Sequence, residues 1–144
     1  MRFVPIKTAE QQAAAMRLKT RDLLVRRRNQ AVNALRAHLS ELGIVAGTGV
    51  GRVAELIAIV RDEDDERLPQ VARLALAGLA DQIEALTTRL GRLEREIVSQ
   101  VRDDTDLRRL TTIPGVGPIS AASIKALVPD PNGFPITTSR DRTL

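Results

Sequence analysis

The 144-residue chain contains no cysteine, tryptophan or tyrosine, and its single histidine is His38. The absence of cysteine excludes disulfides, thiolate zinc sites and thiol nucleophiles. One histidine argues against a histidine-based metal site and against a Ser/His triad. Long apolar runs are also missing: none approaches the roughly 20 residues that span a bilayer, and no signal peptide is recognisable. We therefore expect a cytoplasmic protein without membrane segments.

The apolar residues that are present are almost all aliphatic. Hydrophobic residues make up 43% of the chain, yet its only aromatic residues are Phe3 and Phe134. Ala, Leu, Ile and Val therefore supply nearly all of the apolar surface, as they do in long helices and coiled coils. The composition predicts an elongated α structure with thin cores.

Positive charge is concentrated in the first part of the chain. Residues 1–60 hold ten Lys/Arg and four Asp/Glu, a net charge of +6, whereas the remainder carries −2. Nineteen of the 22 basic residues are arginine, which suits phosphate contacts. The imbalance predicts a polyanionic partner for the first helix. An arginine-rich composition is equally the product of GC-rich coding, and this alternative stays open.

The first long helix is expected over residues 8–42, where no glycine or proline occurs. Thr8, followed three residues later by Gln11, has the form of a capping box, and Gly43 is a natural C-terminal stop. Apolar residues recur at heptad spacing, most densely in the second half. These residues are Leu18, Val25, Val32, Leu35, Leu39 and Leu42. A glycine-rich turn should follow, and then a short helix over residues 52–61.

A second long helix is expected over residues 69–101, with Pro69 suited to its first turn. Its aliphatic residues alternate three and four apart through three full heptads: Leu76, Leu79, Ile83, Leu86, Leu90, Leu93 and Ile97. Neither long helix can bury its stripe alone. We therefore predict an all-α fold with long antiparallel coiled-coil helices, paired as a hairpin within the chain, as a homo-oligomer, or both.

Residues 110–124 have the form of a helix-hairpin-helix motif, in which a Gly-hydrophobic-Gly turn joins two helices. Two glycines would permit the tight turn, and amides at the start of the second helix would bind one DNA phosphate. Ala121 and Ile124 fit the packing positions of that helix, while Pro118 removes one donor. The predicted DNA-binding residues of this motif are Ile113, Gly115, Val116, Gly117, Ile119 and Ser120. The alternative is a helix connection that touches no DNA.

Two charged runs invite functional interpretation. Arg26, Arg27 and Arg28 are predicted DNA-binding residues, forming a basic face with Lys19, Arg21 and Arg36; the alternative is a solvated helix face. The acidic run at residues 62–66 suggests a metal site, but adjacent acids point in several directions, and we interpret the run as a solvated cap before a helix. Asp103, Asp104 and Asp106 receive the same interpretation. We therefore expect no metal site and no cofactor in this chain.

Several short segments, taken in order, carry a family resemblance. They are Arg2–Thr8 leading into Gln11 and Gln12, Arg17 with Arg21–Arg26, Asn33–Arg36, Leu42–Ile44 and Ile113–Pro118. In this order they resemble the insertion-sequence transposases of the IS-one-ten type (the IS-one-sixteen and IS-nine-oh-two group), over about residues 2–131.

The resemblance implies a known plan. Members begin with a ribonuclease-H-like domain whose acidic tetrad binds magnesium. A coiled coil follows, and then a C-terminal domain that opens with the hairpin motif and later supplies a nucleophilic serine. They cut and rejoin DNA as oligomers, with a structured guide RNA where this is established.

The chain departs from that plan at both ends. Residues 1–7 would be the remnant of the catalytic domain, residues 8–106 the coiled-coil segment, residues 107–130 the hairpin start of the C-terminal domain, and residues 131–144 a divergent, disordered tail. No tetrad acid can be assigned, and Ser139 lacks acid-base support as a nucleophile. We expect a doubly truncated transposase, inactive alone, with DNA as its partner. The alternatives are a non-enzymatic coiled-coil DNA-binding regulator and a purely structural coiled coil.

Overall fold

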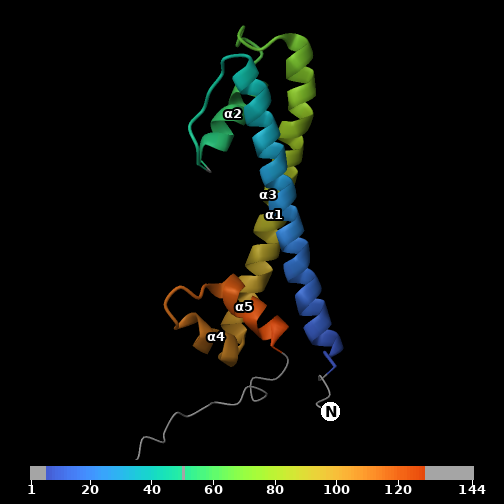
Figure 1. The fold of residues 1–144 in the computed structure, drawn as a ribbon, viewed down its shortest axis with the longest axis vertical. Coiled ribbons are helices and arrows are strands. Elements are labelled where there is room, and N and C mark those ends of the chain that lie inside the picture. The colour runs from blue at the N-terminus through green and yellow to red at the C-terminus, as the bar shows by residue number, and fades with distance from the viewer. Residues whose placement is uncertain (1–5, 50, 129–144) are drawn as a thin grey trace, which may run out of the picture. The chain divides into compact units, whose positions relative to one another are not determined.

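The computed structural model describes residues 6–49 and 51–128, and every regular element within them is a helix. The helices are α1 (Ala9–Glu41), α2 (Gly51–Arg61), α3 (Gln70–Asp103), α4 (Thr105–Thr111) and α5 (Pro118–Leu127), shown in Figure 1. The all-α prediction is confirmed. Predictions for residues 1–5 and for the tail at 131–144 lie outside the described residues. None of the helices in the described part of the chain is long and apolar enough to cross a membrane.

The chain divides into two compact units, each described by itself. The first unit combines Met1–Leu18 with Ile97–Leu144, and the second is Lys19–Glu96. Helices α1 and α3 each contribute to both. The second unit holds the larger core, and the first holds α4 and α5.

Helix α1 begins and ends where its local sequence predicts. The Thr8 amide donates to Gln11 Oε1 at 2.9 Å, and the Gln11 amide donates to Thr8 Oγ1 at 3.2 Å, which is the reciprocal capping box. At the other end Gly43 has φ +75°. The Ile44 amide donates to the Leu39 carbonyl at 2.9 Å, and the Gly43 amide to that of Ser40 at 3.0 Å. These two bonds form a Schellman motif that satisfies the last carbonyls of α1.

In the second unit α1 and α3 run antiparallel, side by side (Figure 1). Arg21 near the middle of α1 forms an ion pair with Glu94 of α3 at 2.6 Å. At the opposite end of the unit Leu39 packs in the same cluster as Leu76. The hairpin form of the predicted helix pair is therefore present within one chain. Self-association stays a prediction.

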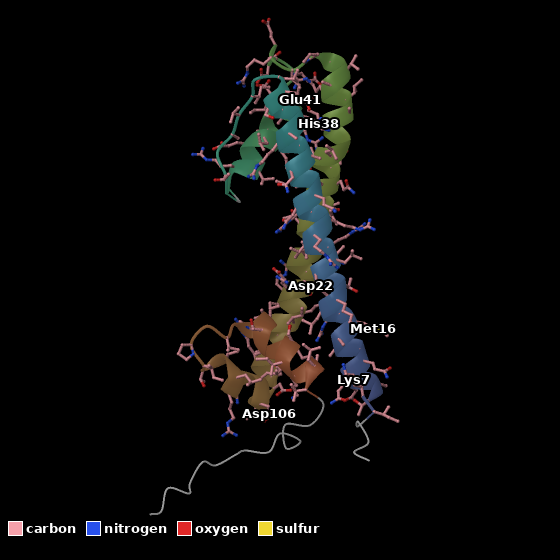
Figure 2. The ribbon with its side chains drawn as sticks, viewed as in Figure 1. Lys7, Met16, Asp22, His38, Glu41 and Asp106 are labelled. Atoms are coloured by element: carbon pink, nitrogen blue, oxygen red, sulfur yellow. The ribbon has the colours of Figure 1, made fainter. Side chains whose placement is uncertain are left out.

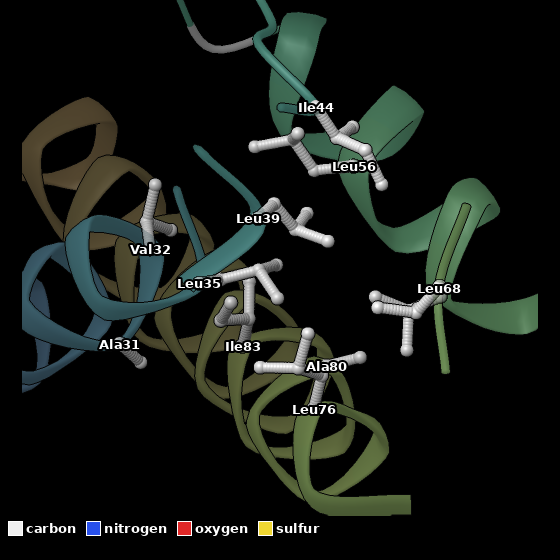
Figure 3. Close-up of a cluster of buried hydrophobic side chains, with 11 residues drawn as sticks. Ala31, Val32, Leu35, Leu39, Ile44, Leu56, Leu68, Leu76, Ala80 and Ile83 are labelled. Carbon is white, nitrogen blue, oxygen red and sulfur yellow. The ribbon is translucent and has the colours of Figure 1, made fainter. Parts of the chain in front are cut away.

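The core of the second unit is aliphatic and joins α1, α2 and α3 (Figure 3). Its buried members are Ala31, Val32, Leu35, Leu39, Ile44, Leu56, Val60, Leu68, Leu76, Ala80 and Ile83. Burying one such leucine or isoleucine stabilises the fold by roughly 1.5–3 kcal/mol. Five of the seven residues predicted for the α3 stripe are buried (Leu76, Ile83, Leu86, Leu90 and Ile97), whereas Leu79 and Leu93 are half-buried.

The stripe of α1 is buried only in its second half. Val32, Leu35 and Leu39 are buried, whereas Leu18 and Val25 are half-buried. Leu42 is exposed, contrary to its predicted seam position. The reason is that α1 ends at Glu41, so Leu42 lies in the turn that Gly43 closes.

Arg73 is the one polar residue buried in the part of the chain that the structure describes. Its Nη1 donates to the carbonyls of Ile59 and Val60, each at 3.0 Å. Its Nη2 donates to the carbonyls of Asp65 at 2.7 Å and Leu68 at 3.3 Å. A cation at the C-terminal end of α2 also meets the negative end of that helix dipole. Arg73 therefore ties α2 and the loop after it to α3.

Asp65, which belongs to the acidic run at residues 62–66, holds the loop between α2 and α3 through its contacts with Arg67. Its carboxylate accepts the Arg67 amide at 3.1 Å, Arg67 Nε at 2.9 Å and Arg67 Nη2 at 2.6 Å. The hydrogen bonds from the Arg67 side chain lower the pKa of Asp65 from 3.8 to about 2. A carboxylate with a depressed pKa stabilises the folded state above its unfolded pKa, and this stabilisation disappears as pH falls through the folded value.

An Asp65→Asn variant should therefore melt at a lower temperature than the parent at pH 5 and above. The difference should shrink between about pH 4 and pH 2, the window set by the two pKa values of Asp65. Melting followed by circular dichroism across this range provides the measurement. Asp64→Asn, at an exposed neighbour, is the control. A melting difference that stays constant down to pH 2 would contradict the assigned role of the Asp65 carboxylate.

The first unit has a small core around α4 and α5. Helices α4 and α5 contact each other, and four of their residues are buried: Leu107 of α4 and Ala121, Ala122 and Ala126 of α5. Asp104 caps α4 by accepting the amides of Asp106 at 3.0 Å and Leu107 at 3.1 Å. Its other oxygen accepts Lys125 of α5, and this bond lowers the pKa of Asp104. One aspartate thus starts α4 and holds α5 against it.

Candidate nucleic-acid interface

The connection between α4 and α5 is a tight turn built on a Pro-Gly pair. The Val116 amide donates to the Ile113 carbonyl at 3.0 Å, closing a four-residue turn with Pro114 and Gly115 at its centre. Gly115 has φ +85°, the value that the third position of a type II turn requires. Ile113 is half exposed, at 50%, and Gly115 is exposed. The turn therefore presents its backbone to solvent.

The N-terminus of α5 offers unpaired amides next to this turn. Gly117 is its N-cap and provides no side-chain hydrogen bond, and Pro118 occupies the first helical position. The amides of Ile119 and Ser120 follow, where a helix has no internal acceptor for them. Ser120 is exposed and Ile119 half-buried. Such a terminus favours an anion, because its free N–H groups and the positive end of the dipole coincide.

Two predictions for this segment need correction. Gly117 was expected to need unusual backbone angles, but its φ of −80° and ψ of 174° are ordinary extended values. Of the two turn glycines, only Gly115 has a positive φ. Ile124 was expected to pack, yet it is 40% exposed, because the three alanines take the packing side of α5. Ala121 is fully buried, as predicted. Both the helix-hairpin-helix motif and its DNA-contacting role stay predictions.

The predicted basic face of α1 is divided by the structure into two sets. Three consecutive arginines point about 100° apart around a helix, so they cannot share one face. Lys19, Arg26 and Arg27 are exposed, whereas Arg21, Arg28 and Arg36 are half-buried. The second set lies on the side of α1 that carries the core.

Half-buried arginines of α1 have partners within the chain. Arg21 forms ion pairs with Asp22 and Glu94, and Arg36 donates to the Gly49 carbonyl at 3.1 Å. In the first unit Arg17 donates to Gln100. Arg26 and Arg27, by contrast, make no ion pair with any residue that the structure describes. Arg28, which is half-buried, also makes no ion pair with a described residue, so Arg26 and Arg27 are the exposed members of the unpaired set and the more accessible to a phosphate backbone.

The proposed DNA-contacting residues fall in different units. Those of the turn and α5 lie in the first unit, and Arg26, Arg27 and Arg28 lie in the second. Within the first unit the structure brings the turn and the α5 terminus together, since Gly117, the residue directly after the turn, is the N-cap of the helix.

Among the described residues, no group of three or more His, Cys, Asp or Glu side chains is placed so that it could hold a metal ion. Within the run at 62–66, Asp62 accepts the Asp64 amide at 3.0 Å and Asp65 is held by Arg67. Arg61, which directly precedes the run, pairs instead with Asp81 at 2.6 Å and Glu84 at 2.9 Å. His38 is exposed on α1 (Figure 2).

Sequence patterns missed Arg73 and the Lys125–Asp104 pair. Arg73 gave no signal because it sits beside the apolar stripe of α3 and its partners are backbone carbonyls. A cap signal for Asp104 was present, since Asp precedes the short helix, but its link to Lys125 joins residues 21 apart in the chain.

Over nearly its whole length the chain is similar to part of several proteins named as transposases. A putative transposase of Sinorhizobium fredii, y4pF/y4sB, is 40% identical over 134 residues, which are 93% of this chain and 34% of that protein. A probable family 20 transposase of Pseudomonas aeruginosa is 39% identical over 136 residues, 93% of this chain and 40% of the relative.

A third relative, the transposase for insertion sequence element IS1328 of Yersinia enterocolitica, is 34% identical over 141 residues, 98% of this chain and 41% of its own length. The chain thus spans between about a third and two-fifths of the length of these relatives. No protein-family model matches the chain, and no solved structure matches it.

Proposed function

We propose that this chain is the coiled-coil and hairpin portion of an insertion-sequence transposase of the IS-one-ten type, and that it holds DNA without cutting it. The observation that carries the proposal is the similarity of 93–98% of the chain to part of the named transposases. As the resemblance implies, the whole protein would act as an oligomer with a guide RNA.

Two surfaces support a DNA-holding role. In the first unit, the exposed Gly115 turn and the free amides of Ile119 and Ser120 suit one phosphate. In the second unit, Arg26 and Arg27 are exposed and unpaired among the described residues. The contacts expected on both surfaces are to phosphates, so the expected binding is independent of DNA sequence.

Gly117→Val tests the hairpin directly. A Cβ at Gly117 meets no atom within 4 Å and the φ is ordinary, so the variant should stay folded and lose only the roughly 1 kcal/mol that an apolar N-cap costs. The added side chain would stand between a phosphate and the α5 amides, and we expect affinity for duplex DNA to fall about tenfold. Fluorescence anisotropy with unrelated duplexes gives the measurement. Unchanged affinity in a folded variant would make the turn a connector and favour the structural coiled-coil alternative.

Arg26→Gln together with Arg27→Gln should weaken binding and reduce the slope of log affinity against log salt by about two. The matched control is Arg89→Gln with Arg92→Gln, two exposed arginines of α3 whose loss changes net charge equally. If both pairs weaken binding equally, net charge alone is responsible. If the parent binds no duplex at low salt, the DNA-holding proposal fails.

The chain alone should leave supercoiled plasmid intact, with or without magnesium. The resemblance implies magnesium in the whole protein, but the described residues offer no ligand set for it, and the run at 62–66 is engaged in loop contacts. An agarose nicking assay with purified chain provides the measurement. Magnesium-dependent nicking that disappears in Asp64→Asn would assign the acidic run a catalytic role and overturn the proposal.

A further inference from the structure

A groove of about 940 Å³ lies in the second unit, lined by α1, α2 and α3. Its floor is aliphatic and includes Val32, Ile57 and Ile83. The core beneath continues to Leu35 and Leu56, so the floor is firmly packed. The groove exists because α2 contacts the α1–α3 pair through Leu56 and Val60, while Val53 and Ile57, on the neighbouring side of α2, are only half-buried.

The rim of this groove is polar and carries unneutralised positive charge. Arg28 and Arg36 of α1 line it, together with Asn29 and Asn33. Arg28 forms no ion pair with any described residue, and Arg36 has a buried Nε without a hydrogen-bond partner there. The acidic residue of the lining, Glu84, is already paired with Arg61 at 2.9 Å. The groove therefore offers an apolar floor beside a cationic edge.

We propose that this groove binds an amphipathic α-helix of a partner protein, with aliphatic residues on the floor and acidic residues beside Arg28 and Arg36. The rim residues of α1 extend over about two turns of that helix, with Arg28 and Arg36 eight residues apart and Asn29 and Asn33 between them. Two turns of a helix about 10 Å wide occupy roughly 850 Å³, which matches the groove. Helix-in-groove recognition uses this combination of apolar anchors and flanking charge. The proposal stands independently of the transposase assignment.

A nucleic-acid strand is the disfavoured occupant of the groove. Single strands bind by stacking their bases on aromatic side chains, and none of the groove residues is aromatic. An aliphatic floor also has no acceptor or donor for a sugar-phosphate backbone. An acidic amphipathic helix can bury apolar side chains on the floor and pair carboxylates with the arginines of the rim. A nucleic acid can only place phosphates beside those arginines.

The full chain can be tested with a fluorescein-labelled, helix-forming peptide of 18 residues. The peptide carries leucine at helical three-four spacing and glutamate on both flanks of the stripe. We expect saturable binding, and we expect Arg28→Glu to weaken it at least about tenfold because like charges then meet. Arg92→Glu is the matched control, since it makes the same charge change at an exposed position of α3 outside the groove and should alter affinity less than about twofold. A peptide with lysine in place of glutamate should not bind.

Methyl NMR of the same chain locates the peptide without any substitution. Signals of Val53 and Ile57 should shift, while those of Val45 and Val71, exposed at other places in the unit, should not. Equal losses in the Arg92 and Arg28 variants, absence of peptide binding, or shifts confined to Val45 and Val71 would each overturn the proposal. So would larger Val53 and Ile57 shifts with a single-stranded oligonucleotide than with the glutamate peptide.

Discussion

Changing Ile83 and Leu90 together to aspartate should abolish the cooperative unfolding transition of the second unit. Both side chains are 2% exposed on the buried stripe of α3. Each loses roughly 1.5–3 kcal/mol of apolar burial, and each new carboxylate would be desolvated without a partner, at a further cost. The combined loss is comparable to the total stability of a small domain, about 5–15 kcal/mol. Circular dichroism should show reduced helicity at 25 °C and no sharp melt.

The matched control places the same charges on the same helix but in solvent. Gln82→Asp with Ala85→Asp also adds two carboxylates, and both positions are exposed. We expect this control to melt cooperatively within a few degrees of the parent. If the two double variants melt alike, the α3 stripe is not the core that the packing describes.

Replacing Arg73 by methionine should lower the free energy of unfolding by about 3 kcal/mol. Methionine keeps much of the side-chain length and the apolar stem but donates no hydrogen bond. Four carbonyls, those of Ile59, Val60, Asp65 and Leu68, would then lose a charged donor inside the fold. Urea denaturation provides the measurement, and the midpoint should fall while the slope stays constant.

Two companion variants separate charge from geometry at this position. Arg73→Lys keeps the charge but replaces the planar fork by one ammonium group, which cannot reach all four carbonyls. Its free energy of unfolding should lie between that of the parent and that of the methionine variant. Arg89→Met removes an exposed arginine from the same helix and should cost under about 0.5 kcal/mol. A methionine variant as stable as the parent would show that the loop after α2 needs no anchor.

The helices could be predicted because their signals are local. Thr8 with Gln11, and Gly43 after the last turn, fix the ends of α1 within a residue or two, and the three-four spacing from Leu76 to Ile97 fixes the buried side of α3. Each signal occupies a few consecutive residues or one helix face. Only the way in which these helix faces pack against each other had to come from the structure.

The candidate site was harder to predict because a count of charged residues does not show which of them form ion pairs or hydrogen bonds within the chain. The excess of +6 in residues 1–60 suggested one basic face, but Arg21 and Arg36 are engaged within the chain. Their partners, Glu94 and Gly49, are brought near by tertiary packing, and no local sequence pattern indicates these contacts. The turn held a usable signal: Pro114-Gly115 marks a type II turn in which Gly115, rather than Gly117, takes the positive φ.

The uneven burial along α1 determines which of its backbone hydrogen bonds break by local unfolding and which break only when the core opens. Its buried residues all fall between Ala31 and Leu39, and no residue before Ala31 is buried in this helix. Amide hydrogens around Leu35 can exchange with solvent only when the core of the second unit opens, whereas those near Leu18 need only local fraying. A long helix with one weakly held half can change its pairing there while its other half stays folded. In a larger assembly, that half of α1 is where a rearrangement costs least.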